Sequence, residues 1–307
     1  SKSAAQNRLY KLNEEVFVSS APLYQHELQR PQHGIDLKYS QDEAELLFLS
    51  SVTGMHLLLS GPAGSGKSTL AKQAISFKDP AEKSYKWPEL VAPHSSVTPA
   101  AFLGGGAQLY QGEIERADHG ILFLDEFLEF DREIIETLRG PMTGEKLRLS
   151  RSGSVREYDC HIQVIATTNF CPCGKWTPEV SYRNCRFSVR KCHSYLEKLS
   201  GPILDRFGLL YFYQNKKAVR DISGEDILNR IQNYKTRVRA ADVEIEPAED
   251  ILSKFYKDIP ARRERSLKVV SQVYAIERES SKIELQDVLK SEKWTYRTFL
   301  SLEGSIS

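Results

Sequence analysis

The chain has 307 residues, of which 40% are hydrophobic, so it can bury one large core and a smaller second one. Its 42 Lys and Arg against 41 Asp and Glu give a formal net charge of +1, which excludes an overall field that would attract nucleic acid or an anionic membrane. No apolar run is long enough to cross a bilayer and no secretory signal is recognisable, so we expect a cytoplasmic protein. Five cysteines, an odd number, favour free thiols or metal ligation over a disulfide framework.

The first part of the chain, residues 1–39, is polar and rich in Gln, which predicts an N-terminal arm or tail without a core of its own. An ordered flap on the main domain is the alternative. The stretch "AELLFLSSV" then has helical spacing, and "HLLLS", from His56 to Ser60, predicts a short buried strand.

A glycine-rich loop, "GPAGSGKS", follows that strand directly. Glycines allow backbone N–H groups to turn toward phosphate oxygens, the lysine reaches the β- and γ-phosphates, and the serine hydroxyl binds Mg²⁺ at a helix N-terminus. The sequence therefore predicts a nucleoside triphosphate site. The expected binding residues are Gly61, Pro62, Ala63, Gly64, Ser65, Gly66, Lys67, Ser68 and Thr69.

Two carboxylates end a second apolar strand, predicted from Ile121 to Glu126. Asp125 is expected to hold Mg²⁺ together with Ser68, and Glu126 to polarise the attacking water as a general base. Asp131 is a candidate N-cap for a helix that ends before a Gly-Pro pair.

A third strand, predicted from His161 to Asn169, completes a set of short apolar strands separated by helices. This pattern predicts an α/β fold with a parallel sheet covered on both faces, and Asn169 is placed to orient the same water. After residue 214 the pattern becomes helical. We expect an ATPase core over residues 40–214 and a helical lid domain over 215–307.

The order of these motifs resembles the AAA+ ATPases, and more specifically the magnesium-chelatase-like group that includes the ComM-type DNA branch-migration helicases. The resemblance is carried by "APHSSVTPAAFLGGG", "GEIERADHGILFLDEFLEF", "CPCG" and "LSGPILDRF". It implies an α/β AAA+ P-loop core with a small helical lid, a homo-oligomeric ring, usually a hexamer, and ATP bound between subunits. ComM-type proteins carry a large N-terminal protease-like domain; residues 1–39 are too few for one, so either the chain is trimmed or it is a short, divergent member.

The same resemblance assigns two arginines. Arg206, in "ILDRF", matches the arginine finger that reaches the γ-phosphate of the neighbouring subunit, where it neutralises charge on the transferred phosphoryl group. A salt bridge to Asp205 or to another neighbouring residue is the structural alternative. Arg262, in "PARRERSLKVV", is the best match to the lid arginine that contacts phosphate within its own subunit, with Arg263 and Arg265 as the alternatives.

The segment from 144 to 160 alternates around a Ser-Gly-Ser turn, which predicts a β-hairpin. In the resembled group a hairpin at this position projects toward the central pore. Four basic residues on it are candidate contacts for a DNA backbone, although solvated charge on an exposed ribbon is the alternative. These residues are Lys146, Arg148, Arg151 and Arg156.

A cysteine-containing insertion, residues 170–193, is the other local signal. Four soft ligands within it could enclose a structural Zn²⁺, and free thiols in a loop are the alternative. The candidate ligands are Cys171, Cys173, Cys185 and Cys192, with His193 as a substitute for the last.

Together these patterns predict an ATP hydrolase that depends on Mg²⁺ and on oligomerisation and that translocates or remodels DNA. The alternative is a magnesium-chelatase-like motor that remodels a protein partner or inserts a cofactor.

Overall fold

The computed structural model describes residues 30–80, 87–105, 110–151, 154–174, 187–213, 219–240 and 259–296. The expected N-terminal arm lies outside these ranges up to residue 29. Among the described residues, no helix is both long and apolar enough to span a membrane.

A five-stranded sheet forms the centre of the molecule, in the order β10-β2-β9-β6-β3. All neighbouring strands in it are parallel, as the short apolar runs predict. The strands are β2 (Leu57–Ser60), β3 (Leu90–Val91), β6 (Ile121–Leu124), β9 (Gln163–Thr168) and β10 (Leu209–Phe212).

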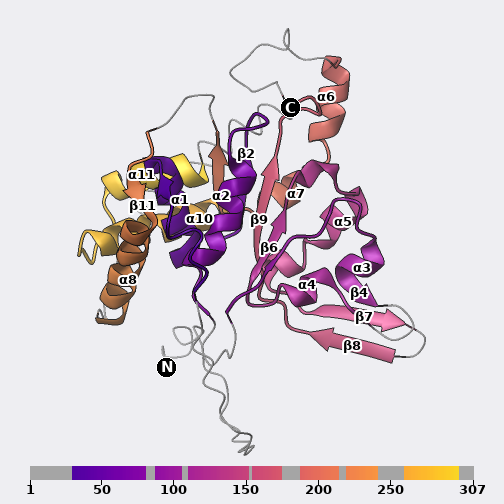
Figure 1. Ribbon diagram of the computed structural model, residues 1–307, viewed down its shortest axis with the longest axis horizontal. Coiled ribbons are helices and arrows are strands. Elements are labelled where there is room, and N and C mark those ends of the chain that lie inside the picture. The colour runs from indigo at the N-terminus through magenta and orange to yellow at the C-terminus, as the bar shows by residue number, and fades with distance from the viewer. Residues whose placement is uncertain are drawn as a thin grey trace, which may run out of the picture.

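Helices cover both faces of this sheet (Figure 1). The α-helices in the core are α1 (Gln41–Thr53), α2 (Lys67–Gln73), α3 (Pro99–Leu103), α4 (Glu113–Arg116), α5 (Arg132–Thr137), α6 (Val189–Leu196) and α7 (Gly201–Leu204). Single 3₁₀ turns lie at Ala74–Phe77, Phe127–Glu129 and Pro141–Thr143. The fold is therefore the α/β AAA+ architecture that the sequence predicts.

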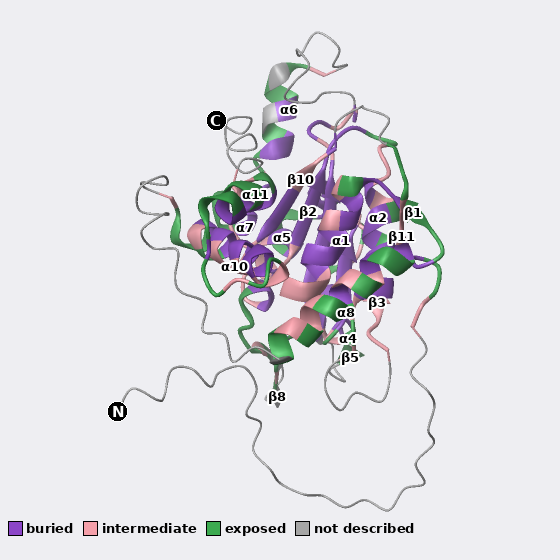
Figure 2. Cartoon of the chain, turned by 90° about the vertical axis from the view of Figure 1, so that its left-hand side faces the viewer, coloured by how far each residue is buried: buried purple, intermediate pink, exposed green. Residues whose placement is uncertain are grey.

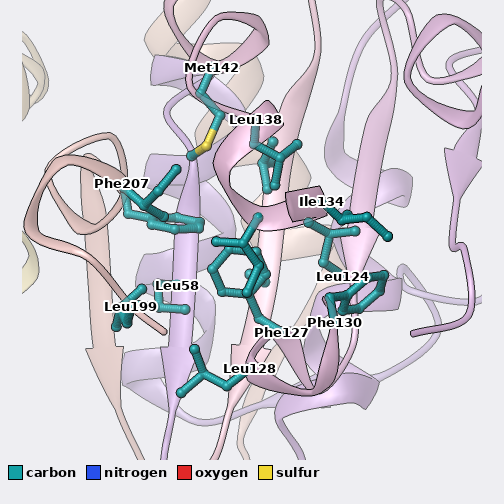
Figure 3. Close-up of a cluster of buried hydrophobic side chains, with 14 of the residues drawn as sticks. Leu58, Leu124, Phe127, Leu128, Phe130, Ile134, Leu138, Met142, Leu199 and Phe207 are labelled. Atoms are coloured by element: carbon teal, nitrogen blue, oxygen red, sulfur yellow. The ribbon is translucent and has the colours of Figure 1, made fainter. Parts of the chain in front are cut away.

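Alternate strand residues point into two separate hydrophobic cores, as the pleat of a strand requires. Leu58 packs into the core beneath α3, α5 and α7, whereas its neighbours Leu57 and Leu59 pack into the core beneath α1 and α2. Figure 3 shows part of the first of these cores, in which mostly leucine and isoleucine side chains pack around Phe127 and Phe207. Strand β2 is buried along its length, whereas the last two residues of β10 are half-buried (Figure 2).

The C-terminal part is helical, with α8 (Gly224–Ala240), α10 (Ala261–Glu277) and α11 (Leu285–Thr295). Arg230 of α8 ties it to the core, because its guanidinium binds both Glu45 of α1 and Glu277 of α10. A small cluster that includes Leu267 and Val288 packs α10 on α11.

Short two-stranded ribbons lie outside the sheet. The longest joins β7 (Leu147–Arg151) to β8 (Ser154–Tyr158), within the segment predicted as a hairpin, and projects from the lower right of Figure 1. The others pair β1 (Lys38–Tyr39) with β11 (Ile222–Ser223) and β4 (Gly104–Gly105) with β5 (Tyr110–Gln111).

His56, just before β2, provides a test of this packing by pH. Its Nδ1 accepts a hydrogen bond from the Val164 backbone at 3.0 Å and its Nε2 lies 2.8 Å from the Met142 carbonyl oxygen. Burial lowers the pKa of His56 to about 4 from the ordinary value of 6.5. Between these two values the unfolded chain binds a proton that the folded chain does not, so stability falls as the pH falls through this window, by at most about 3 kcal/mol.

We expect His56→Gln to lower the free energy of unfolding near neutral pH and to flatten its dependence on pH below about 6.5. Urea denaturation at several pH values measures both effects. His94→Gln is the matched control because His94 is exposed. Equal pH dependence of the wild type and His56→Gln would contradict the assignment.

Candidate nucleotide site

The glycine-rich loop lies between β2 and α2, at the carboxyl end of the sheet. Gly61, Gly64 and Gly66 all have positive φ angles, of 146°, 76° and 94°, which side chains with a Cβ rarely adopt. A Cβ on Gly61 would also lie 2.8 Å from the Cβ of Tyr213. The loop therefore has the conformation that turns backbone N–H groups toward phosphate.

Lys67 begins α2, and its ammonium group folds back onto the loop. Nζ donates to the carbonyl oxygens of Gly61 at 3.0 Å and Pro62 at 2.6 Å, and to Oδ1 of Asn169 at 3.2 Å. Burial lowers the pKa of Lys67 to about 8, against the raising effect of the carboxylates of Asp125 and Glu126. The lysine thus joins the loop to the end of β9, where the sequence predicts the water-orienting asparagine.

The acidic pair at the end of β6 lies against the first turn of α2. Oδ1 of Asp125 accepts hydrogen bonds from Ser68 Oγ at 2.6 Å and from Thr167 Oγ1 at 2.5 Å. Thr167 Oγ1 accepts in turn from the backbone N–H of Glu126 at 3.0 Å. Sequence reasoning gave Thr167 no role of its own, although it stands beside Asn169 in the "TTN" motif.

Glu126 has a φ of 53°, in the left-handed region, which is uncommon for a residue other than glycine. This turn ends β6 at Leu124, two residues before the predicted end, and leaves the Glu126 side chain exposed beside a half-buried Asp125. Strained backbone of this kind concentrates at functional sites.

The predicted cysteine site adjoins the phosphate loop. The carbonyl of Gly174, at the end of "CPCG", accepts from the Ala63 backbone N–H at 3.1 Å. The sulfur atoms of Cys171 and Cys173 are 3.0 Å apart, and Cys192 is buried. Cys185 lies outside the described residues, so the four-ligand zinc site stays a prediction.

Two residues near the loop were missed by sequence reasoning. The guanidinium of Arg220 lies beside Gly66, with a nitrogen 3.6 Å from where a Cβ would stand, and it binds Glu43 of α1 at 2.8 Å. Tyr195 of α6 is buried against the same edge of the sheet, where burial and the Glu129 carboxylate raise its pKa. Both depend on contacts between distant segments, for which the sequence holds no local signal.

Arg206 lies near Arg139 and Arg262, which come from other segments, rather than in the ion pair with Asp205 that was one alternative. Its Nε donates to the Arg139 carbonyl at 2.8 Å and its Nη1 to the Pro202 carbonyl at 2.6 Å. Burial lowers the pKa of Arg206, and the charges of Arg262 and Arg139 lower it further.

The lid arginines differ sharply in their surroundings. Arg262 is exposed and near Arg206, and none of the described hydrogen bonds of the phosphate loop involves it. Arg263 is fully buried, and its guanidinium donates to the carbonyls of Leu204 and Phe207, on either side of Arg206. Arg263 therefore holds the loop that carries Arg206.

The predicted DNA contacts lie on the β7–β8 hairpin, far along the chain from the phosphate loop. Lys146 and Arg148 are exposed, and each lies near an acid of the returning strand: Lys146 is 3.4 Å from Asp159 and Arg148 is 3.9 Å from Glu157. Arg151 ends β7 and Arg156 lies within β8; the structure describes only their backbone.

Residues 72–220, which begin just after the phosphate loop, match the family model described as magnesium chelatase, subunit ChlI. Over this segment the chain is similar to the magnesium-chelatase-like AAA+ proteins.

The chain is also similar to curated proteins. It is 30% identical over 215 residues to the uncharacterised protein YifB of Escherichia coli K12, covering 60% of this chain and 42% of that protein. It is 32% identical over 190 residues to the competence protein ComM of Haemophilus influenzae, covering 55% and 36%. An uncharacterised Mycobacterium tuberculosis protein is 32% identical over 204 residues, covering 58% and 40%. The chain thus spans about two fifths of the length of these relatives.

Similarity to this magnesium-chelatase-like family implies use of a nucleotide and Mg²⁺, and the residues fit both. Ser68 and Asp125 offer two hard oxygen donors 2.6 Å apart beside the loop, and oxygen is the ligand that Mg²⁺ prefers. The same donor set at the end of a strand and the start of a helix is typical of phosphate-binding loops.

The pKa of Lys67 predicts how nucleotide affinity depends on pH. Phosphate favours the charged lysine, so below about pH 8 binding needs no extra proton, whereas above it binding takes up a proton and the affinity falls by up to about tenfold per pH unit. Calorimetry with MgATP in two buffers of different ionisation enthalpy, on Glu126→Gln to prevent turnover, measures this uptake.

The matched control is Lys72→Ala on the same background, which removes an exposed lysine of the same helix and should leave the proton uptake unchanged. Lys67→Arg, charged throughout this range, should bind weakly without proton uptake. If the Glu126→Gln parent bound MgATP with the same affinity at about pH 9 as at about pH 8 and took up no proton, Lys67 would not be the titrating group.

Proposed function

We propose that this chain is the ATPase module of an oligomeric AAA+ motor that remodels DNA. The observation that carries the ATPase part is the hydrogen-bonded chain from Ser68 through Asp125 and Thr167 to Glu126. Binding alone does not need a carboxylate in a strained turn beside the metal ligands, whereas hydrolysis does.

In this proposal each residue has a defined part in hydrolysis. Lys67 transfers its hydrogen bonds from the loop carbonyls to the β- and γ-phosphates, and Ser68 and Asp125 hold Mg²⁺. Mg²⁺ bound there neutralises charge on the phosphate oxygens. Glu126 takes the proton of the attacking water, and Asn169, 3.2 Å from the Lys67 ammonium, orients that water.

We further propose that the site is completed by a neighbouring copy of the chain, in a ring that is a hexamer as in the resembled group. Burial and the charges of Arg262 and Arg139 oppose the charge of Arg206, and the carboxylates of Glu145 and Asp205 offset this only in part. A triphosphate of the adjacent copy would relieve this repulsion. We assign Arg262 to the same contact with the triphosphate of the adjacent copy. The resemblance instead implied that Arg262 contacts the phosphate bound in its own chain.

The DNA part of the proposal rests on the projecting hairpin and on a named relative. Four basic residues surround its turn, and a ring would bring several copies of the hairpin together. The Haemophilus relative is named a competence protein. The acids that face Lys146 and Arg148, Asp159 and Glu157, reduce the local charge of the hairpin.

A second function, remodelling of a protein partner or insertion of a cofactor, is supported by the family description, which names a magnesium chelatase subunit. Measuring ATP hydrolysis with and without DNA distinguishes this function from DNA remodelling.

Steady-state ATP hydrolysis with single-stranded and forked DNA, at low and moderate salt, tests the proposal. We expect DNA to raise the rate several-fold, and less so as salt rises, because counterion release makes backbone binding depend on salt. Glu126→Gln should lower the rate by about 10²-fold or more while MgATP still binds. Lys146→Glu/Arg148→Glu should remove the DNA stimulation and keep the basal rate.

Arg132→Glu/Lys290→Glu is the control for charge reversal, since both side chains are exposed and lie on other elements. Hydrolysis that DNA does not alter would reject the DNA part and favour the protein partner. Hydrolysis that persists in Glu126→Gln would reject the catalytic assignment.

A further inference from the structure

Three side chains of the types that ligate metal ions lie together at the amino ends of the strands, whereas the nucleotide site lies at their carboxyl ends. Asp118 and His119 lie just before β6, and His161 lies just before β9, so all three are at the amino ends of neighbouring strands. One ligand atom from each lies within 4.8 Å of the others. None of these residues takes part in the hydrolysis proposed above.

The distances are close to those of a coordinated ion. Asp118 Oδ2 is 3.7 Å from His119 Nε2, and Asp118 Oδ1 is 3.8 Å from His161 Nδ1. Ligands about 2.0–2.1 Å from a tetrahedral ion are about 3.3 Å apart, so these two Asp–His pairs need to close by only about half an ångström. The ligand atoms of the two histidines lie within 4.8 Å of each other and must approach further.

The backbone already fixes the two loops against each other. His119 N–H donates to the His161 carbonyl at 3.0 Å, and His161 N–H donates to Asp118 Oδ1 at 2.8 Å. The three donors are therefore brought together by bonds other than those to a metal, which lowers the cost of ordering them on binding.

The two imidazoles are stacked, with ring centroids 4.9 Å apart and an interplanar angle of 8°. Parallel rings do not direct their in-plane lone pairs at one point, so at least one ring must turn. The side chains of His119 and His161 are 54% and 57% exposed, and the torsion that turns a histidine ring is broad, so this rotation is inexpensive.

Arg116, a cation close to this cluster in the sequence, is already paired with acids. Arg116, two residues before Asp118, binds Glu89 and Glu113, both at 3.0 Å. These acids offset the positive charge that would otherwise oppose a cation at Asp118.

We propose that Asp118, His119 and His161 form a binding site for a divalent transition-metal ion of the zinc, nickel or copper type. Two imidazoles and one carboxylate suit these ions, and the remaining coordination position is open to water or to a ligand from a partner. The ion would link the amino end of β6 to the amino end of β9. This position is close to the base of the β7–β8 hairpin, because β8 ends at Tyr158, three residues before His161.

Calorimetric titration of the full chain with Ni²⁺ tests this site. Ni²⁺ favours imidazole, and a Cys171→Ser/Cys173→Ser background removes thiols that could compete near the phosphate loop. We expect one Ni²⁺ per chain and a rise in melting temperature, because an ion that binds only the folded state stabilises it. His119→Asn, which tolerates the φ of 56°, and His161→Gln should each weaken Ni²⁺ binding about tenfold or more.

His94→Asn is the matched control, since it removes an exposed histidine on another loop and should change neither the affinity nor the thermal shift. Circular dichroism of each variant without metal shows whether it folds. Equal Ni²⁺ affinity in folded wild type, His119→Asn and His161→Gln would overturn the proposal. Loss of binding in His94→Asn would equally overturn it.

Discussion

The carboxylate of Asp125 is the contact on which the nucleotide site depends. Its Oδ1 accepts hydrogen bonds from the hydroxyl groups of Ser68 in α2 and Thr167 in β9. One oxygen atom thus connects the start of α2 with the carboxyl ends of the neighbouring strands β6 and β9. Because Thr167 also accepts the N–H of Glu126, the same network fixes the strained turn that holds the candidate base. Parallel strands make this possible, since their carboxyl ends lie at one edge of the sheet.

A second set of contacts connects the helical lid with the loop of the candidate arginine finger. Arg263 of α10 is fully buried and binds the carbonyls on both sides of Arg206, while Arg230 of α8 joins Glu45 of α1 to Glu277 of α10. A movement of the lid would therefore pull directly on the loop of Arg206. This gives a physical route by which nucleotide state in one copy could alter its contact with the next.

The sequence predicted individual strands and motifs better than the contacts between segments that are distant in the chain. The glycine loop, the acidic pair and the apolar strands were predictable because their residue types have local physical causes. The predicted strand from His161 was too long at both ends, since His161 and Asn169 lie in the flanking turns of Gln163–Thr168. The strand order, the role of Thr167 and the approach of Arg220 to Gly66 depend on non-local packing, which no short motif encodes.

Mixing two variants tests most directly whether the ATPase site is shared between copies. Glu126→Gln and Arg206→Ala should each be inactive alone, because each damages every site in its own assembly. In co-assembled equal mixtures, about a quarter of the interfaces would pair an intact Glu126 with an intact Arg206, so hydrolysis should return to about that fraction of the wild-type rate. Mixed assemblies that stay inactive would contradict a site completed by Arg206 of the neighbouring copy.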